Sequence, residues 1–164
     1  MAAWLDYDLL LDAANSRPDY LFVLIGPDYD GSIKRSGILQ KKNIYWLGPK
    51  PYTELPQYLK YFDVATIPFL LNEITHSTSP LKLFEYMSAG KPIVTTAMNE
   101  SQRYPVVQVA NNSHDFVTKI DHAIELQKDH EYLQELDRLA RENTWAKRTE
   151  MILRAYDMSQ IAKR

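Results

Sequence analysis

Hydrophobic and polar positions along the chain follow two alternating periods, which predict an α/β protein. Five short runs rich in β-branched and aromatic residues are typical of strands buried in a parallel sheet. These predicted strands are residues 20–28, 43–49, 63–70, 91–96 and 105–110. Elsewhere, apolar residues recur at helical spacing. The predicted helices are residues 2–16, 53–62, 79–90, 113–126, 129–142 and 144–164, with a polar stretch holding one short helix at 29–42 and a polar loop at 72–78.

Strands that alternate with helices through short connections predict a parallel sheet with helices on both faces. Such sheets bind ligands outside the carboxyl ends of their strands. The Gly-Pro corners at Gly26 and Gly48, the loop after Leu70 and the helix start at Ser79 are all expected at that edge. A doubly wound domain normally opens with a strand, whereas this chain opens with a predicted helix. Either the sheet begins late or an upstream strand is missing, and we favour the second interpretation.

The segment SPLKLFEYMSAGKPIV, residues 79–94, carries the strongest local signals. Ser79 as N-cap and Pro80 at the first helical position predict a helix start, as do Thr53 as N-cap and Pro56 in the first turn of the helix at 53–62. Gly90 predicts the end of the helix that begins at Ser79. These signals place the helix between a ligand-binding edge and the next strand.

Lys82 and Glu85 lie three residues apart on this helix and have two interpretations. They can form an exposed ion pair, which contributes only a few tenths of a kcal/mol. Alternatively, the free N–H groups of the first turn and the Lys82 ammonium can face a diphosphate while Glu85 accepts hydrogen bonds from ribose hydroxyls. The spacing alone leaves both interpretations open.

Composition narrows the class of partner. Hydrophobic residues make up 45% and charged residues 24% of the 164 residues, and the formal net charge is −2. This balance argues against a nucleic-acid partner, whose binding surface would be basic. The absence of cysteine excludes disulfides, thiolate metal ligands and cysteine nucleophiles. No apolar run reaches the roughly 18 residues of a membrane span and no signal-peptide pattern is present, so we predict a cytoplasmic location.

Several motifs resemble the C-terminal, donor-binding domain of GT-B glycosyltransferases, in particular the retaining enzymes of glycosyltransferase family 4 (group 1). The resemblance is carried by NIYWLGPKPYTELPQYLKYFDVATIPF, by SPLKLFEYMSAGKPIVTT, by TWAKR and by WLDYDLLLDAANSRPDYLFVLIGP. It covers nearly the whole chain in the expected order. It implies one nucleotide-sugar-binding Rossmann-like domain over residues 1–164, which is half of a GT-B fold. It further implies a fragment that lacks the N-terminal acceptor domain and is inactive alone.

The resemblance also assigns site residues, one motif position at a time. Glu85 matches the second glutamate of the Glu-x7-Glu motif, which binds the ribose. At the position of the first glutamate the chain has Ser77, and Glu73 lies four positions too early to replace it. The implied diphosphate turn comprises Ser79, Pro80, Leu81 and Lys82, and the implied base loop comprises Gly48, Pro49 and Lys50. Catalytic residues are not assigned.

The family resemblance implies transfer of a sugar from a nucleoside-diphosphate donor to an acceptor hydroxyl, with retention of configuration. It implies no cofactor and no metal, a role in cell-envelope polysaccharide biosynthesis, and a full-length protein that can sit at the inner face of the membrane. The last helix would cross to the partner domain. The alternatives are a stand-alone flavodoxin-like signalling module or a GT-B-shaped sugar-nucleotide epimerase.

Several further polar residues have both a functional and a structural interpretation. His76, Ser77 and Thr78 precede the helix and can contact sugar or phosphate, as can Thr75, although such residues are common in ordinary loops. Asp28 and Asp30 can hold a cation, but turns at these aspartates are the favoured explanation. We predict that Trp145 anchors the last helix by packing and that three histidines are surface residues. These are His114, His122 and His130.

Overall fold

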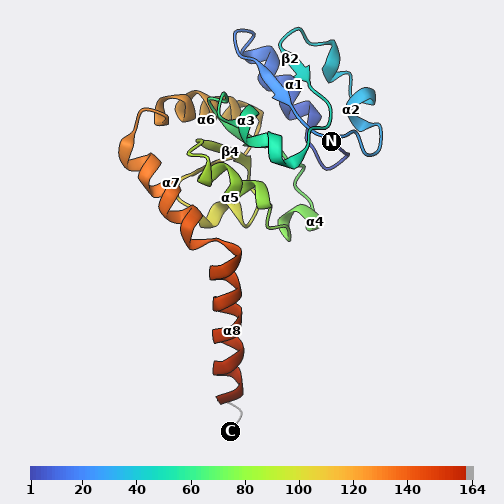
Figure 1. The fold of residues 1–164 in the computed structure, drawn as a ribbon. Helices are drawn as coiled ribbons and strands as arrows, with labels where there is room; N and C mark the ends of the chain where they lie inside the picture. Colours follow the sequence, from blue (N-terminus) through green and yellow to red (C-terminus); the bar gives the residue numbers. More distant parts are fainter. Residues whose placement is uncertain (162–164) are drawn as a thin grey trace.

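Short parallel strands build two sheets in the computed structural model, which describes residues 1–161 (Figure 1). The first sheet pairs β1 (Phe22–Leu24) with β2 (Ile44–Trp46). The second has the order β3-β4-β5, formed by β3 (Ala65–Ile67), β4 (Ile93–Thr96) and β5 (Val107–Ala110). Every strand pairing among these is parallel. The predicted α/β architecture with parallel strands is confirmed, and the strands are divided between two sheets.

The helices follow the predicted order, with corrections at their ends. The chain forms α1 (Tyr7–Ser16), α2 (Ser32–Arg35), α3 (Leu55–Leu59), α4 (Glu73–His76), α5 (Leu81–Ser88), α6 (Ser113–Leu126), α7 (His130–Glu142) and α8 (Trp145–Ile161). Three 3₁₀ turns in residues 1–161 are η1 (Ile38–Gln40), η2 (Tyr52–Glu54) and η3 (Ser101–Arg103). The first helix begins at Tyr7 and not at Ala2, because the Asp6 side chain caps the Leu9 amide. Thr53 is not a helix cap, since α3 follows η2 without a side-chain cap; Pro56 does lie in the first turn.

Helices cover both faces of the β3-β4-β5 sheet. Ile93 and Val94 are consecutive, fully buried residues of β4, so their side chains point to opposite faces. Ile93 packs in one cluster with Met87 of α5 and Leu136 of α7. Val94 packs in a second cluster with Leu9 of α1 and Phe116 of α6. The predicted arrangement of helices on both faces is therefore confirmed.

The two sheets meet along α1. Leu9 and Ala13 of α1 belong to the cluster with α6, whereas Leu10 and Ala14 belong to a third cluster with Ile44 of β2. Figure 1 shows α1 beside β2 and α2 at one end of the molecule, with α5, α6 and α7 around β4. The helix therefore packs against both sheets.

The first six residues run across the carboxyl ends of both sheets. The Met1 amino group donates to the Pro27 carbonyl, and the Tyr29 amide donates to the Met1 carbonyl at 2.9 Å. Further along, the Asp6 amide donates to the Pro68 carbonyl at 2.9 Å. The corners are also joined, since the Gly26 amide donates to the Gly48 carbonyl at 2.9 Å. The loops after β1, β2 and β3 therefore converge on one edge, as predicted.

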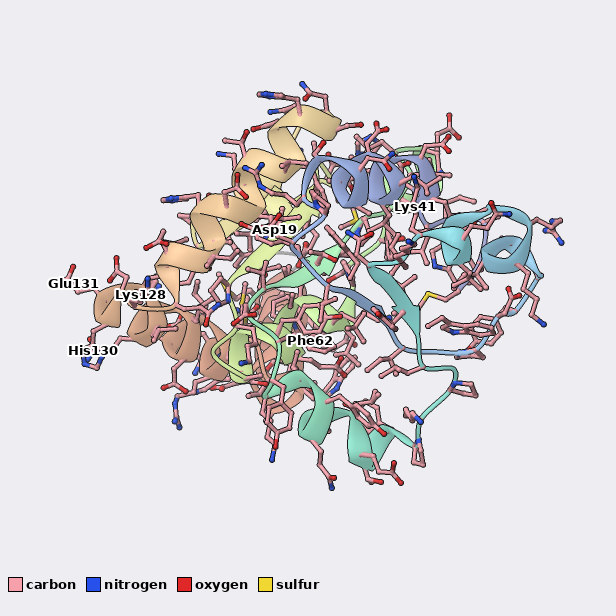
Figure 2. The ribbon with its side chains drawn as sticks, turned by 90° about the horizontal axis from the view of Figure 1, so that it is seen from above. Asp19, Lys41, Phe62, Lys128, His130 and Glu131 are labelled. Carbon is pink, nitrogen blue, oxygen red and sulfur yellow. The ribbon has the colours of Figure 1, made fainter. Side chains whose placement is uncertain are left out.

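The C-terminal helix α8 extends away from the rest of the chain (Figure 1). Its side chains from residue 151 to residue 158 are all exposed. The three histidines predicted to be surface residues are also exposed. Figure 2 shows His130 with Lys128 and Glu131 at the turn between α6 and α7, pointing away from the body. Within residues 1–161, no helix combines the length and apolar character that a bilayer span requires.

An ion pair joins the end of α1 to α6 at some distance from the converging loops. The Arg17 guanidinium donates from Nε to Asp121 Oδ1 at 2.9 Å and from its terminal nitrogen to Oδ2. The Tyr20 hydroxyl donates to the same carboxylate at 3.0 Å. The hydrogen bonds from Arg17 lower the pKa of Asp121.

We predict that Asp121→Asn lowers the free energy of unfolding by about 1 kcal/mol at pH 7, because it breaks a bidentate, partly exposed pair. The folded carboxyl has the lower pKa, so its stabilisation is complete above the unfolded pKa of about 4 and is lost as pH falls below it. Urea unfolding at pH 7 and pH 3 measures both effects. Glu135→Gln, which breaks an ion pair within α7, is the control and should cost less than about 0.5 kcal/mol. An equal loss for both variants at pH 7 would contradict the prediction.

Candidate functional site

The start of α5 lies at the converging edge and differs by one residue from the prediction. The N-cap is Pro80, which has an extended backbone, and the helix begins at Leu81. Ser79 is not the cap, because its hydroxyl donates to Glu100 Oε1 at 3.1 Å. The Pro80 carbonyl accepts the first bond of the turn, from the Leu83 amide at 3.0 Å, so the helix starts one residue later than predicted. Within the described residues, the amides of Leu81 and Lys82 have no backbone acceptor, as expected in a first helical turn.

The other end of α5 is a Schellman motif, as the glycine stop predicts. Gly90 has φ +63°, its amide donates to the Met87 carbonyl at 2.9 Å, and the Lys91 amide donates to the Tyr86 carbonyl at 3.0 Å. Leu83, Phe84 and Met87 are buried, so the opposite face carries Lys82 and Glu85 toward solvent. This packing fixes the rotation of the helix and with it the direction of both charged side chains.

Glu85 is held by a tyrosine and not by Lys82. The Tyr52 hydroxyl donates to Glu85 Oε1 at 2.7 Å. No ion pair joins Lys82 to Glu85 in the part of the chain that the structure describes, so the interpretation as an exposed ion pair is wrong. Burial lowers the pKa of the Met1 amino group, and the nearby positive charge of Lys82 contributes to the same shift. Lys82 therefore lies close to the N-terminal segment at the converging edge.

The predicted base loop lies beside Glu85. Gly48 has φ +69°, a left-handed conformation that favours glycine, and it turns the chain after β2. Pro49 and Lys50 follow, with the Lys50 ammonium 5.6 Å from the centre of the Tyr58 ring. Since Tyr52 comes two residues after Lys50, its hydrogen bond to Glu85 brings the loop and α5 together.

The segment before Ser79 is more ordered than the predicted loop. Asn72 and Thr75 form a capping box that starts the single turn of α4. The Thr75 hydroxyl donates to the Leu70 carbonyl, and the Thr78 hydroxyl donates to the Ile74 carbonyl at 2.8 Å, so both serve the local backbone. Glu73 begins the turn whereas Ser77 ends it. Glu73 therefore does not occupy the position of the missing glutamate.

Three buried side-chain polar atoms in the loops at this edge have no hydrogen-bond partner in the described residues. They are His76 Nδ1 at the end of α4, Asp28 Oδ1 after β1 and Ser101 Oγ after β4. Unpaired buried polar atoms are uncommon and mark places where a ligand or water supplies the partner. His76 therefore stays a candidate for sugar or phosphate contact, while Ser77 is exposed at the end of the turn.

Asp30 forms the turn that was the favoured explanation for it. Its Oδ1 accepts the Ser32 amide and its Oδ2 accepts the Ala3 amide, at 2.9 and 2.8 Å. Hydrogen bonds from Ser32 and from the Ala3 amide lower the pKa of Asp30 to about 2. Across residues 1–161, no three His, Asp or Glu side chains are arranged to hold a metal ion.

A cluster of polar side chains surrounds Glu100, and the sequence pattern does not predict it. Glu100 Oε1 accepts hydrogen bonds from Ser79, from the Tyr104 hydroxyl at 3.2 Å and from Arg148 at 3.4 Å. Arg103 pairs with Oε2 at 3.2 Å. The Arg148 guanidinium also stacks over the Phe84 ring at 4.2 Å. These contacts tie the loop after β4 and the start of α8 to the start of α5.

Arg148, and not Trp145, anchors the last helix. Trp145 is 73% exposed, so the prediction that it packs is wrong within the described residues. The anchor Arg148 does belong to the TWAKR motif, but Trp145 is the most apolar residue of that motif and is therefore the residue that the sequence pattern favours. The partners Glu100 and Phe84 are far away in sequence, and no local pattern reveals them.

The surface hollows at α7 and at the start of α8 are not lined by the predicted site residues. They are lined by residues of α7 and of the α7–α8 junction, including Leu133, Arg141 and Met151. The candidate site is instead an open edge formed by loops from both sheets and by the start of α5.

Comparison with known proteins identifies the family to which this chain belongs. The family model for group 1 glycosyl transferases matches residues 6–126, which is more than half of the chain. The chain belongs to the group 1 glycosyltransferases. This family assignment replaces the alternative of a flavodoxin-like signalling module. The putative teichuronic acid biosynthesis glycosyltransferase TuaH of Bacillus subtilis is 29% identical over 147 residues, which cover 86% of this chain and 37% of TuaH.

Solved glycosyltransferase structures share the fold. The catalytic domain of cholesterol-α-glucosyltransferase from Helicobacter pylori matches with a TM-score of 0.69 and 16% identity, over 87% of this chain and 92% of that one. Anabaena HepE, solved with UDP and glucose, matches with a TM-score of 0.64 and 16% identity, over 85% of this chain and 40% of HepE. The glycosyltransferase WaaG of lipopolysaccharide biosynthesis matches with a TM-score of 0.59 and 14% identity, over 83% and 38%. These similarities establish a Rossmann-like half of the GT-B fold.

Two substitutions at the start of α8 can test whether Arg148, and not Trp145, anchors this helix of the glycosyltransferase domain. Arg148→Ala should lower the free energy of unfolding by about 1–2 kcal/mol, because it removes the stacking on Phe84 and leaves Glu100 with fewer partners. Trp145→Ala should change it by less than about 0.5 kcal/mol, because the indole is exposed. Chemical denaturation of both variants checks this order, and a larger loss for Trp145→Ala would show that Trp145 is the anchor.

Proposed function

We propose that this domain binds the nucleoside-diphosphate sugar donor of a glycosyltransferase. The observation that carries the proposal is the placement of Glu85 on α5, one turn after the free amides of Leu81 and Lys82 and beside the loop at Gly48. An acceptor carboxylate suits two ribose hydroxyls, whereas helix amides and an ammonium suit a diphosphate. The three parts of a nucleoside diphosphate thus match three neighbouring parts of the edge.

In the proposed reaction, the bond between the sugar anomeric carbon and the diphosphate oxygen breaks. A new bond forms between that carbon and the acceptor oxygen, whose proton is released, and the nucleoside diphosphate leaves. The amides of α5 and Lys82 stabilise the charge that grows on the leaving diphosphate. The family resemblance supports retention of configuration. The absence of a cofactor and of a required metal stays a prediction.

Relatives support a polysaccharide acceptor. TuaH is a putative glycosyltransferase of teichuronic acid biosynthesis, and HepE was solved with UDP and glucose. We therefore propose a hexose donor carried on a nucleoside diphosphate and an acceptor hydroxyl on a cell-envelope polysaccharide or its precursor. Peripheral attachment to the inner face of the membrane would bring the domain to such an acceptor.

We also propose that the domain works beside an acceptor-binding N-terminal domain. The chain spans only 37% of TuaH and 40% of HepE, so these relatives are much longer.

Two features of the backbone support an additional strand between the sheets. Neither β1 nor β3 pairs with another named strand on its second edge in residues 1–161, and Met1 makes a parallel-type rung with Pro27 and Tyr29. The domain alone should bind nucleotide and catalyse no transfer.

We predict that one of UDP, GDP or ADP binds this chain and shifts the amide NMR signals of Leu81 to Glu85 during titration. Glu85→Gln should weaken that binding about tenfold or more, because hydrogen bonds from the ribose to a charged acceptor are lost. Glu131→Gln, at the distant α6–α7 turn, is the matched control and should bind as the wild type does. Unchanged signals with every nucleotide would reject the site.

A second variant tests the diphosphate half of the site. Lys82→Met should weaken binding of the nucleoside diphosphate and reduce the dependence of its dissociation constant on salt, because one cationic contact is lost. Binding of the matching nucleoside, which carries no phosphate, should not change. Calorimetry at two salt concentrations measures these values, and an equal loss for nucleoside and diphosphate would place Lys82 elsewhere.

Release of an epimerised sugar by the full-length protein would instead identify an epimerase.

A further inference from the structure

Tyr52 occupies an unusual position for an aromatic residue. It is the first residue of η2 and is 68% exposed, so packing explains little of its placement. Its hydroxyl nevertheless donates to Glu85 Oε1 at 2.7 Å, across 33 positions of sequence. The bond spans the gap between the loop that follows β2 and the helix α5. It therefore connects the two sheets at the candidate site.

Among the described residues, Tyr52 is the hydrogen-bond partner of the Glu85 carboxylate. The Lys50 ammonium lies over the Tyr58 ring, and the described residues contain no ion pair between Lys82 and Glu85. A phenol suits this position because it donates one hydrogen bond without adding a charge. The hydrogen bond to the carboxylate also raises the pKa of Tyr52 above its ordinary value of about 10. The phenol thus stays protonated, and able to donate, throughout the neutral range.

The hydrogen bond leaves most of the carboxylate available. An ionised carboxylate has about four lone-pair sites on its two oxygens, and Tyr52 takes one of them. The remaining sites can accept hydrogen bonds from two ribose hydroxyls. Since one oxygen is already fixed, the glutamate loses less side-chain freedom when the ribose binds, which is the usual gain from preorganisation.

We propose that Tyr52 is a positioning residue that holds the Glu85 carboxylate in the orientation that receives the ribose of the donor nucleotide. This role rests on the proposed function of Glu85 in nucleotide binding. It adds the residue that links ribose recognition to the base loop, so both parts of the nucleoside are recognised by one connected structure.

The experiment compares nucleotide binding by Tyr52→Phe and by the wild-type chain. Tyr52→Phe removes only the hydroxyl, and Tyr61→Phe is the matched control because Tyr61 is also exposed, at 77%. Calorimetry uses UDP, GDP and ADP and their 2′,3′-dideoxy analogues. We expect Tyr52→Phe to weaken ribonucleotide binding about three- to tenfold. Binding of the dideoxy analogue should not change, and Tyr61→Phe should match the wild type.

A second readout needs no nucleotide. NMR titration of ¹³C-labelled tyrosine, with the Tyr52 signal assigned by its loss in Tyr52→Phe, reports the phenol pKa. In Glu85→Gln the Tyr52 pKa should fall toward its ordinary value, because the anionic acceptor is gone. An unchanged pKa would show that the two side chains do not interact in solution and would overturn the proposal.

The outcomes separate the positioning role from the proposed function. If Glu85→Gln removes the preference for ribose while Tyr52→Phe binds ribonucleotides as tightly as the wild type, the positioning role fails and the nucleotide site stands. If the wild-type chain binds ribo- and dideoxynucleotides equally, ribose recognition by Glu85 fails and the role of Tyr52 fails with it. A selective ribonucleotide defect in Tyr52→Phe supports both.

Discussion

The packing of α1 into two hydrophobic clusters determines how the two sheets sit relative to each other. Leu9 and Ala13 contact one cluster, and their chain neighbours Leu10 and Ala14 contact the other, so one helix presents adjacent stripes to both sheets. Strand pairing does not join β1 to β3 in residues 1–161. The distance between the loop after β2 and the start of α5 therefore depends on this helix and on the backbone bonds of residues 1–6. The candidate site inherits its geometry from that packing.

The charges around the start of α5 are arranged so that an anion can approach it. Glu100 lies next to the helix start through its bond to Ser79, and an isolated carboxylate there would repel a phosphate. Arg103 and Arg148 pair with this carboxylate, and the Glu100 side chain is only 12% exposed. Its negative charge is thus largely balanced, while Lys82 stays exposed and unpaired with Glu85 in the described structure. The cluster around Glu100 therefore leaves little unbalanced negative charge next to the start of α5.

Features with local causes could be predicted from sequence, whereas those with distant causes could not. The bounds of α6 follow from its apolar period and from Asn112, which caps the helix, and Gly90 ends α5 as expected. The capping box of Asn72 and Thr75 is also local, but its short turn has no apolar period, so the sequence pattern predicts a loop there. The bond between Tyr52 and Glu85 and the contacts of Arg148 join residues distant in sequence. Only the folded arrangement of the two sheets brings them together.

The helix α8 has few tertiary contacts that stabilise it within the described residues. It has 17 residues, and an isolated helix of this length is only marginally stable in water. Ion pairs of Glu150 with Lys147 and Arg154 contribute only a few tenths of a kcal/mol each. Arg148 fixes the base of the helix, but beyond it Ile152 and Tyr156 remain exposed, at 70% and 59%. Within residues 1–161, therefore, burial of apolar side chains contributes little to the stability of α8, and Arg148 at its base is the main tertiary contact described.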